Sequence, residues 1–301
     1  MPAERVALYT TVYAGVERYL APWYRSVQAQ TDTDFDLWIS VDGLAPDAVA
    51  RAIGEVPAAR WLEAAPGESP ARLRTVALER LVTAYPAVVF VDSDDVMHPS
   101  RVAAARAALR DHDVTACALE IIDRNGSAVG AVFEPPDGAA LDTLLVHHNV
   151  FGLSNSAYRS DLLRRCLPAP ADCLLMDWLL VTRAWTAGAS LGFDRTPRMS
   201  YRQYAGNVAR VLPPFAPAYV LQATERVLNH YRCVLDPAWP LPQCHRETLG
   251  RAQDVARAFH AAITGSAATL TRYIEALNQL PPRYVWWWCV AHPELEDAWS
   301  N

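Results

Sequence analysis

The sequence predicts an α/β protein with a mostly parallel central sheet flanked by helices. Short apolar segments alternate with longer segments of helical periodicity between residues 6 and 91, a pattern typical of parallel sheets covered on both faces. Two of the apolar segments run directly into acidic residues, Asp42 and Asp92. The chain has 301 residues, 51% of them hydrophobic and 20% charged, which is enough for one large domain or two smaller ones.

The first part of the chain carries the regular alternation. Strands are expected over 6–11, 35–41, 60–64 and 87–91, and helices over 16–29, after Pro46 and over 70–84. The first helix is indicated by apolar residues at helical spacing, namely Val16, Tyr19, Leu20, Trp23 and Val27. Because ligands bind beyond the carboxyl ends of parallel strands, we expect Asp42 and Asp92 at the ligand-binding edge of the sheet.

The rest of the chain is less regular. Pro99 fits the first turn of a helix that ends near Arg110. Asn125-Gly126 predicts a turn between strands over 114–123 and 128–133. Further elements are expected over 149–158 (extended), 175–187 (helix closed by Gly188), 199–204 (a short strand), and 218–232, 246–263 and 267–279 (helices). The proline-rich segment 212–217 divides a predicted catalytic domain, 1–210, from a C-terminal helical region, 211–301.

Composition excludes several classes of function. A net charge of −6 argues against a nucleic-acid partner. No apolar run approaches the roughly 20 residues that cross a bilayer, and the N-terminus runs straight into a strand-like segment, so we expect a cytoplasmic protein without a signal peptide. The six cysteines contain no C-x-x-C pair and are interpreted as buried thiols. All 27 basic residues are arginine, which excludes mechanisms that need a lysine.

The segment "VVFVDSDDVMHPS" places three carboxylates, Asp92, Asp94 and Asp95, directly after a buried strand. Two such charges about 4 Å apart repel by roughly 4 kcal/mol at an effective dielectric near 20. One interpretation is a solvated loop that caps the helix at Pro99. The other is a site for a hard divalent cation, because Mg²⁺ and Mn²⁺ take oxygen ligands and magnesium sites commonly combine one or two carboxylates with substrate phosphates.

The order and spacing of several motifs resemble the inverting family 2 glycosyltransferases, which have the glycosyltransferase-A fold. The motifs are "VYAGVERYLAPWYRSVQAQT", "FDLWISVDG", "PARLRTVALERL" and "VVFVDSDD", and the resemblance covers residues 5–210. "YRQYAGN" (201–207) is similar to a segment of bacterial members, rhamnosyltransferases among them. The resemblance implies a catalytic domain that binds a nucleotide-diphospho-sugar, with UDP- or dTDP-sugars as the expected donors.

The resemblance also implies roles for individual residues. Asp42 would bind the nucleotide base and Arg72 would lie beside the nucleotide, while Asp94 would hold Mn²⁺ or Mg²⁺ and Asp92 would lie near the ribose or the metal. Other residues expected to contact the nucleotide sugar are Thr11, Tyr13 and Arg202.

The segment "LLMDWLLVTRAWTAG" resembles the family segment whose aspartate is the general base, and Asp177 takes that place. A buried unpaired carboxylate is costly, so we expect Asp177 to face a cleft or an arginine. His148, Asn149 and Trp178 are expected on the acceptor side. Departures from the family pattern are Ala14, Val41, Leu73, Met176 and Tyr204; they leave the base and the sugar of the donor open.

The predicted function is metal-dependent, inverting transfer of a sugar to a hydroxyl of a polysaccharide, a lipid-linked sugar or a small glycoside. The C-terminal helices are expected to shape the acceptor side or an oligomer contact, and the "WWW" run (286–288) to pack against them. The alternatives are a catalytically degenerate glycan- or partner-binding protein on the same scaffold, a nucleotidyltransferase, and a haloacid dehalogenase-type phosphatase. The last would use the "DSDDV" motif, but about 90 residues precede it and lysine is absent.

Overall fold

One mixed sheet runs through the molecule. The structure, a computed structural model, describes residues 5–300, and this part of the chain holds a nine-stranded sheet. The strands are β1 (Val6–Tyr13), β2 (Phe35–Asp42), β3 (Ala59–Glu63), β4 (Ala87–Phe90), β5 (Val96–Met97), β6 (Val114–Ile122), β7 (Ala128–Phe133), β8 (Ser156–Arg159) and β9 (Leu191–Arg202).

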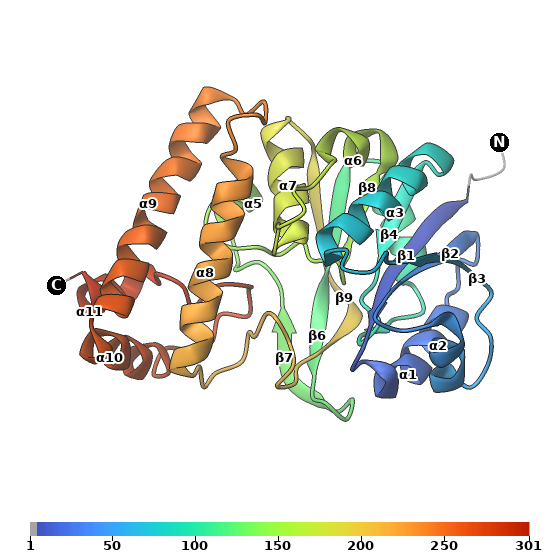
Figure 1. Cartoon of the computed structure of the whole chain (residues 1–301), viewed down its shortest axis with the longest axis horizontal. Coiled ribbons are helices and arrows are strands. Elements are labelled where there is room, and N and C mark those ends of the chain that lie inside the picture. The colour runs from blue at the N-terminus through green and yellow to red at the C-terminus, as the bar shows by residue number, and fades with distance from the viewer. Residues whose placement is uncertain (1–4, 301) are drawn as a thin grey trace.

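Helices cover the sheet, and the helices of the C-terminal region lie beside it (Figure 1). They are α1 (Glu17–Gln28), α2 (Pro46–Ile53), α3 (Pro70–Ala84), α4 (Arg101–Ala108), α5 (Leu141–Leu145), α6 (Ser160–Cys166), α7 (Met176–Thr186), α8 (Pro217–Val234), α9 (Gln243–Gly265), α10 (Ala267–Leu277), the 3₁₀ helix η1 (Pro293–Leu295) and α11 (Glu296–Trp299). No helix within residues 5–300 is long and apolar enough to cross a membrane.

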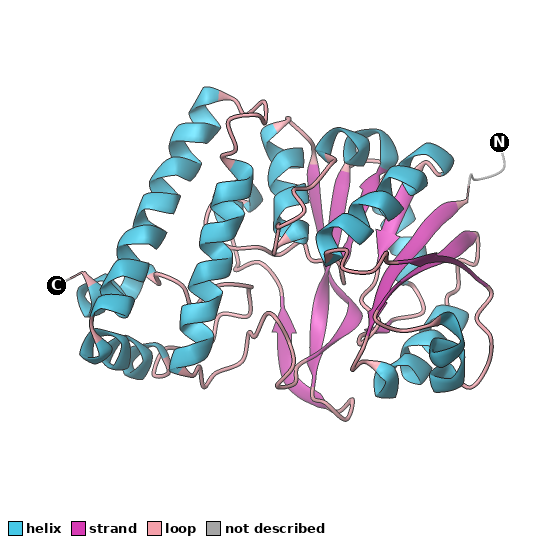
Figure 2. Cartoon of the chain, viewed as in Figure 1, coloured by secondary structure: helices cyan, strands magenta, loops and turns pink. Residues whose placement is uncertain are grey.

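The strand order is β3-β2-β1-β4-β8-β6-β9-β5, and β7 pairs with β6. The four strands β3, β2, β1 and β4 are parallel, as the alternating pattern predicted. Beyond them β8 runs antiparallel to both β4 and β6, while β9 runs parallel to β6. Figure 2 shows the sheet between its helices, which confirms the predicted α/β class. The carboxyl ends of β1, β2 and β4 therefore meet at one edge.

The main differences from the sequence-based expectations lie in the second half of the sheet. The strand expected over 199–204 is the end of a much longer strand, β9, which starts at Leu191. β9 pairs with β6, and the register shifts near Cys117 and Ala118. The middle of β9 is polar, and Arg198 Nε donates to Asp194 there (2.9 Å). This part of the strand therefore lacks the alternation of apolar and polar residues that predicts a strand. The helix α6 was not expected.

The C-terminal helices share one hydrophobic core with the sheet. Tyr231 on α8 donates its hydroxyl to the carbonyl of Val146 (2.7 Å), and Trp288 donates its indole N–H to the carbonyl of Val211 (3.3 Å). All three tryptophans of the "WWW" run are buried, as expected for packing residues. The proposed boundary at residue 211 thus separates two parts of one packed body.

The cysteines are free thiols. Five of the six are buried, as expected, but Cys244 on α9 is exposed. Cys244 was therefore wrongly placed in the core: it lies in the first turn of a helix whose buried stripe begins at Leu249.

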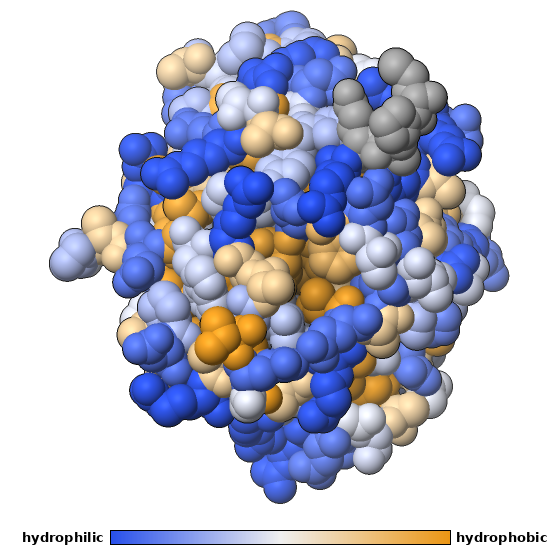
Figure 3. Space-filling model, turned by 90° about the vertical axis from the view of Figure 1, so that its right-hand side faces the viewer, coloured by the Kyte–Doolittle hydropathy of each residue, from blue (hydrophilic) through white to orange (hydrophobic). Residues whose placement is uncertain are grey.

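The surface beside β3 and α2, at the right of Figure 1, has apolar side chains in its middle and hydrophilic ones around them (Figure 3). A cavity of about 600 Å³ lies among α1, β2 and β3, with Tyr24, Phe35 and Leu37 in its lining. Phe35 and Leu37 belong to the amino end of β2, so this cavity is at the opposite end of the strand from Asp42.

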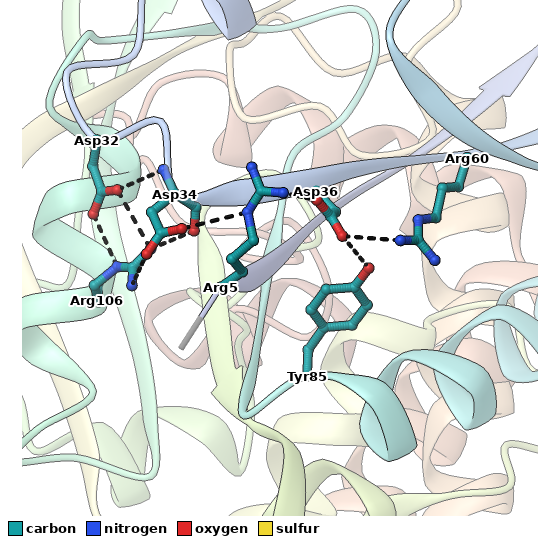
Figure 4. A network of polar contacts seen from close by, with 7 residues as sticks. All are labelled: Arg5, Asp32, Asp34, Asp36, Arg60, Tyr85 and Arg106. Carbon is teal, nitrogen blue, oxygen red and sulfur yellow. Dashed lines mark hydrogen bonds and ion pairs between the residues drawn. The ribbon is translucent and has the colours of Figure 1, made fainter. Parts of the chain in front are cut away.

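A network of ion pairs ties α4 to the start of β2 (Figure 4). Arg106 on α4 pairs with Asp32 (2.9 Å) and Asp34 (3.6 Å), and it also donates to the carbonyl of Asp34 (2.5 Å). Its side chain is only 16% exposed. At the other end of the network Asp36 pairs with Arg60 (3.3 Å), whose side chain is 62% exposed.

Replacing Arg106 by Ala is expected to lower the free energy of unfolding by about 1–3 kcal/mol, because it leaves partly buried acceptors without their charged donor. The matched variant Arg60→Ala removes an exposed pair and should cost less than about 1 kcal/mol. Urea denaturation of both variants checks this. Equal losses would show that Arg106 is no anchor for α4.

Candidate active site

The carboxyl ends of β1 and β2 bring predicted nucleotide-binding residues together. Tyr13, at the end of β1, lies opposite Asp42, at the end of β2. Ser93, in the turn after β4, donates its hydroxyl to the carbonyl of Thr11 (2.9 Å). This bond fastens the acidic turn to β1. Thr11, Tyr13, Asp42 and Asp92 therefore occupy one edge of the sheet.

Asp94 is buried and accepts hydrogen bonds from two tyrosines. Its Oδ2 atom accepts from the hydroxyl of Tyr204 (2.9 Å) and from that of Tyr13 (3.3 Å). Burial raises the pKa of Asp94, and the tyrosine hydrogen bonds oppose that shift. Burial, followed by the charge of Asp94, also raises the pKa of both tyrosines, so they remain hydrogen-bond donors at neutral pH. Tyr204, a departure from the family pattern, thus forms a hydrogen bond with the predicted metal ligand Asp94.

Asp92 is partly buried beside Asp94, and an arginine faces it. Burial and then the charge of Asp94 raise the pKa of Asp92, whereas the charge of Arg74 lowers it. Arg74 extends from α3, and its Nε atom donates to the hydroxyl of Thr11 (3.4 Å). Sequence reasoning did not assign Arg74 to the site. The sequence signal that could have indicated Arg74 was the acidic cluster, because neighbouring carboxylates require a nearby positive charge.

Arg72 takes a different position. Its side chain is 53% exposed and pairs with Glu68 at 3.9 Å. Its backbone N–H donates to the hydroxyl of Ser69, the residue that caps α3 (3.2 Å). The assignment of Arg72 to the nucleotide stays a prediction.

Asp95 and Arg202 hold the acidic turn in place. Asp95 is buried, and its carboxylate accepts the backbone N–H of Arg202 (2.7 Å) and the hydroxyl of Ser154. Arg202 in turn donates its Nε–H to the carbonyl of Asp94 (2.8 Å). The acidic run is therefore not a solvated loop. It also does not cap the next helix, whose N-cap residue is Ser100.

Asp177 lies in the first turn of α7, where helix N–H groups favour a carboxylate. Burial raises its pKa to about 6, while the backbone N–H of Trp178, the charge of Arg74 and the amide of Asn149 oppose this shift. The Asn149 amide donates to Asp177 Oδ2 at 2.9 Å. Because Asn149 Oδ1 accepts the backbone N–H of Phe151 (2.9 Å), its NH₂ group must point toward Asp177.

The C-terminal segment supports this contact from behind. Trp286 donates its backbone N–H to the carbonyl of Asn149 (3.2 Å), and its indole N–H donates to the hydroxyl of Tyr201 (3.1 Å). Its ring lies over Gly152, so closely that a Cβ atom there would collide with it. Asn149 is thus fully buried between Asp177 and a tryptophan that lies about 140 residues further along the chain.

Two other residues predicted on the acceptor side differ in exposure. Trp178 is completely buried: its indole N–H donates to the carbonyl of Leu145 (3.0 Å) and its ring stacks on His230 at 4.0 Å. His148 is partly exposed, and burial lowers its pKa to about 3, so it is neutral. Their roles toward an acceptor stay predictions.

The donor set at the acidic turn fits a hard divalent cation that also binds a diphosphate. Within residues 5–300 no group of three or more His, Cys, Asp or Glu side chains could hold a metal by itself. Asp92 and Asp94 supply two carboxylates, and neither forms an ion pair within 4.0 Å in this part of the chain. Two carboxylates plus substrate phosphates is the usual arrangement for Mg²⁺.

Comparison with known proteins identifies the fold. No model of a known protein family matches, and no curated protein does. Solved structures do match: S. aureus TarS has a TM-score of 0.58 at 17% identity, over 87% of this chain and 74% of its own. The mannosyltransferase PcManGT from Pyrobaculum calidifontis, solved with GDP-Man and Mn²⁺, has a TM-score of 0.58 at 15% identity, over 99% of this chain and 88% of its own. The chain has the fold of a glycosyltransferase.

Both neighbours are of the glycosyltransferase-A type, which confirms the fold that the sequence motifs implied. TarS has also been solved with UDP-GlcNAc, and in that form it has a TM-score of 0.55 at 16% identity, over 86% of this chain and 72% of its own. The glycosyltransferase-A fold differs from that of haloacid dehalogenase phosphatases and gives no support to that alternative.

Gly152→Ala tests the packing behind Asn149. The new methyl group must displace the Trp286 ring, and we expect a loss of about 1–3 kcal/mol in the free energy of unfolding. Gly250→Ala, on α9, is the matched control: no atom lies within 4 Å of its added methyl group. Because Ala is favoured over Gly in a helix, the control should be neutral or stabilising by up to about 1 kcal/mol. Similar melting curves for the two variants would contradict the contact.

Proposed function

We propose that the protein is a metal-dependent, inverting glycosyltransferase that uses a nucleotide-diphospho-sugar. One observation carries the proposal. The Asp92–Asp94 pair and Asp177 come from distant parts of the chain, yet they lie close enough for the charge of Asp177 to raise the pKa of Asp92. The charge of Arg74 acts on both Asp92 and Asp177. The proposed cation site and the proposed general base thus share one edge of a glycosyltransferase fold.

Each group has a distinct role in this proposal. Mn²⁺ or Mg²⁺, held by Asp94 and Asp92, would neutralise the charge that develops on the departing diphosphate. Asp177 accepts the proton of the acceptor hydroxyl, which attacks the anomeric carbon from the face opposite the diphosphate. One displacement inverts the anomeric configuration, so no enzyme nucleophile is required. The hydrogen bond from Asn149 fixes the orientation of the Asp177 carboxylate that would accept this proton.

The donor is proposed to be a UDP- or dTDP-sugar, with Thr11, Tyr13 and Asp42 on the nucleoside side. UDP-GlcNAc bound to TarS and GDP-Man bound to PcManGT support the class of donor. The proposed acceptor is a glycan or glycoside hydroxyl. The C-terminal region 211–301 is proposed to shape the acceptor side, because Trp286 supports the residue that orients Asp177.

The first test concerns donor and metal. A thermal-shift screen of UDP-, dTDP- and GDP-sugars should show a larger stabilisation with Mn²⁺ than with EDTA for the true donor. At 100 times the dissociation constant the gain is roughly 2.7 kcal/mol. Asp94→Asn should abolish the difference between Mn²⁺ and EDTA. A metal effect that survives in Asp94→Asn would remove Asp94 from the metal site.

The second test separates an enzyme from a binding protein. Asp177→Asn keeps the shape of the side chain and removes its basicity. Transfer in single-turnover assays should fall 10²- to 10⁴-fold, as is typical when acid–base catalysis is lost, whereas titration with the donor should give an unchanged affinity. Donor binding without transfer in the wild-type protein would favour the binding-protein alternative. Parallel loss of affinity and transfer in the variant would make Asp177 a structural residue.

A third test compares the pH dependence of transfer and of stability in the wild type and in Asp177→Asn. Wild-type transfer should decline below about pH 6, where Asp177 becomes protonated. Because the folded pKa lies above the unfolded value of 3.8, ionisation of Asp177 costs stability as pH rises through this window. At pH 7.5 Asp177→Asn should therefore be as stable as the wild type or more stable, by up to about 3 kcal/mol. A clear loss of stability at pH 7.5 would contradict the assignment.

A further inference from the structure

A second cavity, with several polar residues in its lining, lies outside the proposed donor edge. Its volume is about 560 Å³, and α1, the turn between β6 and β7, and the end of β9 surround it. Its lining includes Arg18, Tyr19, Arg124, Asn125, Ser200 and Arg202. Apart from Arg202, none of the residues assigned above to donor, metal or general base is in this lining.

Positive groups from different elements converge at this cavity. Arg18 on α1 donates to the carbonyl oxygen of Arg124 (3.3 Å), and Arg202 on β9 donates to the same oxygen (3.5 Å). Both guanidinium groups also lie 4.6 Å from the centre of the Tyr19 ring. Two like charges thus flank one ring and share one acceptor. Arg124, in the turn between β6 and β7, is a third arginine among the lining residues.

Ion pairs do not neutralise these charges. In the described part of the chain, none of the three arginines forms an ion pair within 4.0 Å. The buried Arg202 donates its side-chain N–H groups to the carbonyls of Asp94, Asp123 and Arg124. One carboxylate oxygen of Asp123, Oδ1, accepts the backbone N–H groups of Asn125 and Ser127. The charge of Arg202 also acts on Asp94 and Asp123, and Glu120 accepts a hydrogen bond from Ser200 (3.5 Å), so Arg18 and Arg124 supply most of the available positive charge.

We propose that this cavity binds a phosphate group, either free or as the ester of a small polyol or sugar. Guanidinium groups recognise phosphate and carboxylate oxygens through paired N–H groups. Guanidinium groups reach the cavity from α1 and from β9, and a further arginine lies in the β6–β7 turn, an arrangement that suits the several oxygens of a phosphate. The cavity also has the apolar side chains Pro22, Val96 and Ile122 in its lining, which suit the carbon skeleton of an ester.

The cavity adjoins the acidic turn. Tyr19 packs on Tyr204, with ring centres 5.1 Å apart, and Tyr204 donates to Asp94. Arg202 connects the two sites directly through the carbonyl of Asp94 (2.8 Å). If the ester belongs to the acceptor, the cavity holds the part of the acceptor remote from the reacting hydroxyl. That last step rests on the proposed transferase function, whereas phosphate binding itself does not.

Isothermal titration with inorganic phosphate and with glycerol 3-phosphate tests the proposal. It uses the full chain in EDTA, without nucleotide, at constant ionic strength. The variant Arg18→Gln/Arg124→Gln removes the charge of two of the three lining arginines and leaves Arg202 in place. The control Arg25→Gln/Arg80→Gln makes the same change of charge at two exposed arginines outside the cavity.

Saturable binding to the wild type and the control, at least 10-fold weaker in Arg18→Gln/Arg124→Gln, supports the site. Tighter binding of glycerol 3-phosphate than of inorganic phosphate identifies an ester as the ligand, and equal affinity identifies free phosphate. No saturable binding of either probe, or equal binding by all three proteins, overturns the proposal. Since no donor or metal is present, a failure of the transferase proposal leaves this result unaffected.

Discussion

The repulsion among carboxylates at one edge of the sheet is the constraint on which the rest of the site depends. Burial raises the pKa of Asp92, Asp94, Asp95 and Asp177 alike, so each of these groups is held at a cost in stability. A fold stabilised for its own sake would place such residues in water. Their burial at this edge is the basis for the proposal that they serve a ligand that brings positive charge.

Different neighbouring groups stabilise each of these carboxylates against the repulsion. Two tyrosine hydroxyls contact Asp94, a backbone N–H and a serine hydroxyl occupy Asp95, and the amide of Asn149 orients Asp177. Arg74 supplies positive charge without forming an ion pair with any of the carboxylates in the described residues. The C-terminal segment contributes through Trp286. The helical region therefore takes part in the architecture of the site, although it contributes none of these carboxylates.

Local patterns allowed the parallel half of the sheet, and the positions of Asp42 and Asp92 at its edge, to be predicted from the sequence. The motif order added the fold type. Only the end of the long strand β9 was predicted, because its polar middle lacks strand periodicity. Arg72 and Arg74 lie two positions apart on α3, about 200° around the helix, so the face toward the site depends on packing. The link from Trp286 to Asp177 through Asn149 depends on tertiary contacts that no local pattern records.

The turn after β4 is proposed to hold a divalent cation together with a diphosphate. Electron paramagnetic resonance of Mn²⁺ measures this directly, because the six-line signal of free Mn²⁺ weakens when the ion is bound. Titration of the protein with Mn²⁺ in the presence of saturating UDP, dTDP or GDP, with protein-free nucleotide as the reference, counts the bound ions. We expect one additional Mn²⁺ bound per chain with the nucleotide of the true donor. A signal identical to the protein-free reference for all three nucleotides would contradict it.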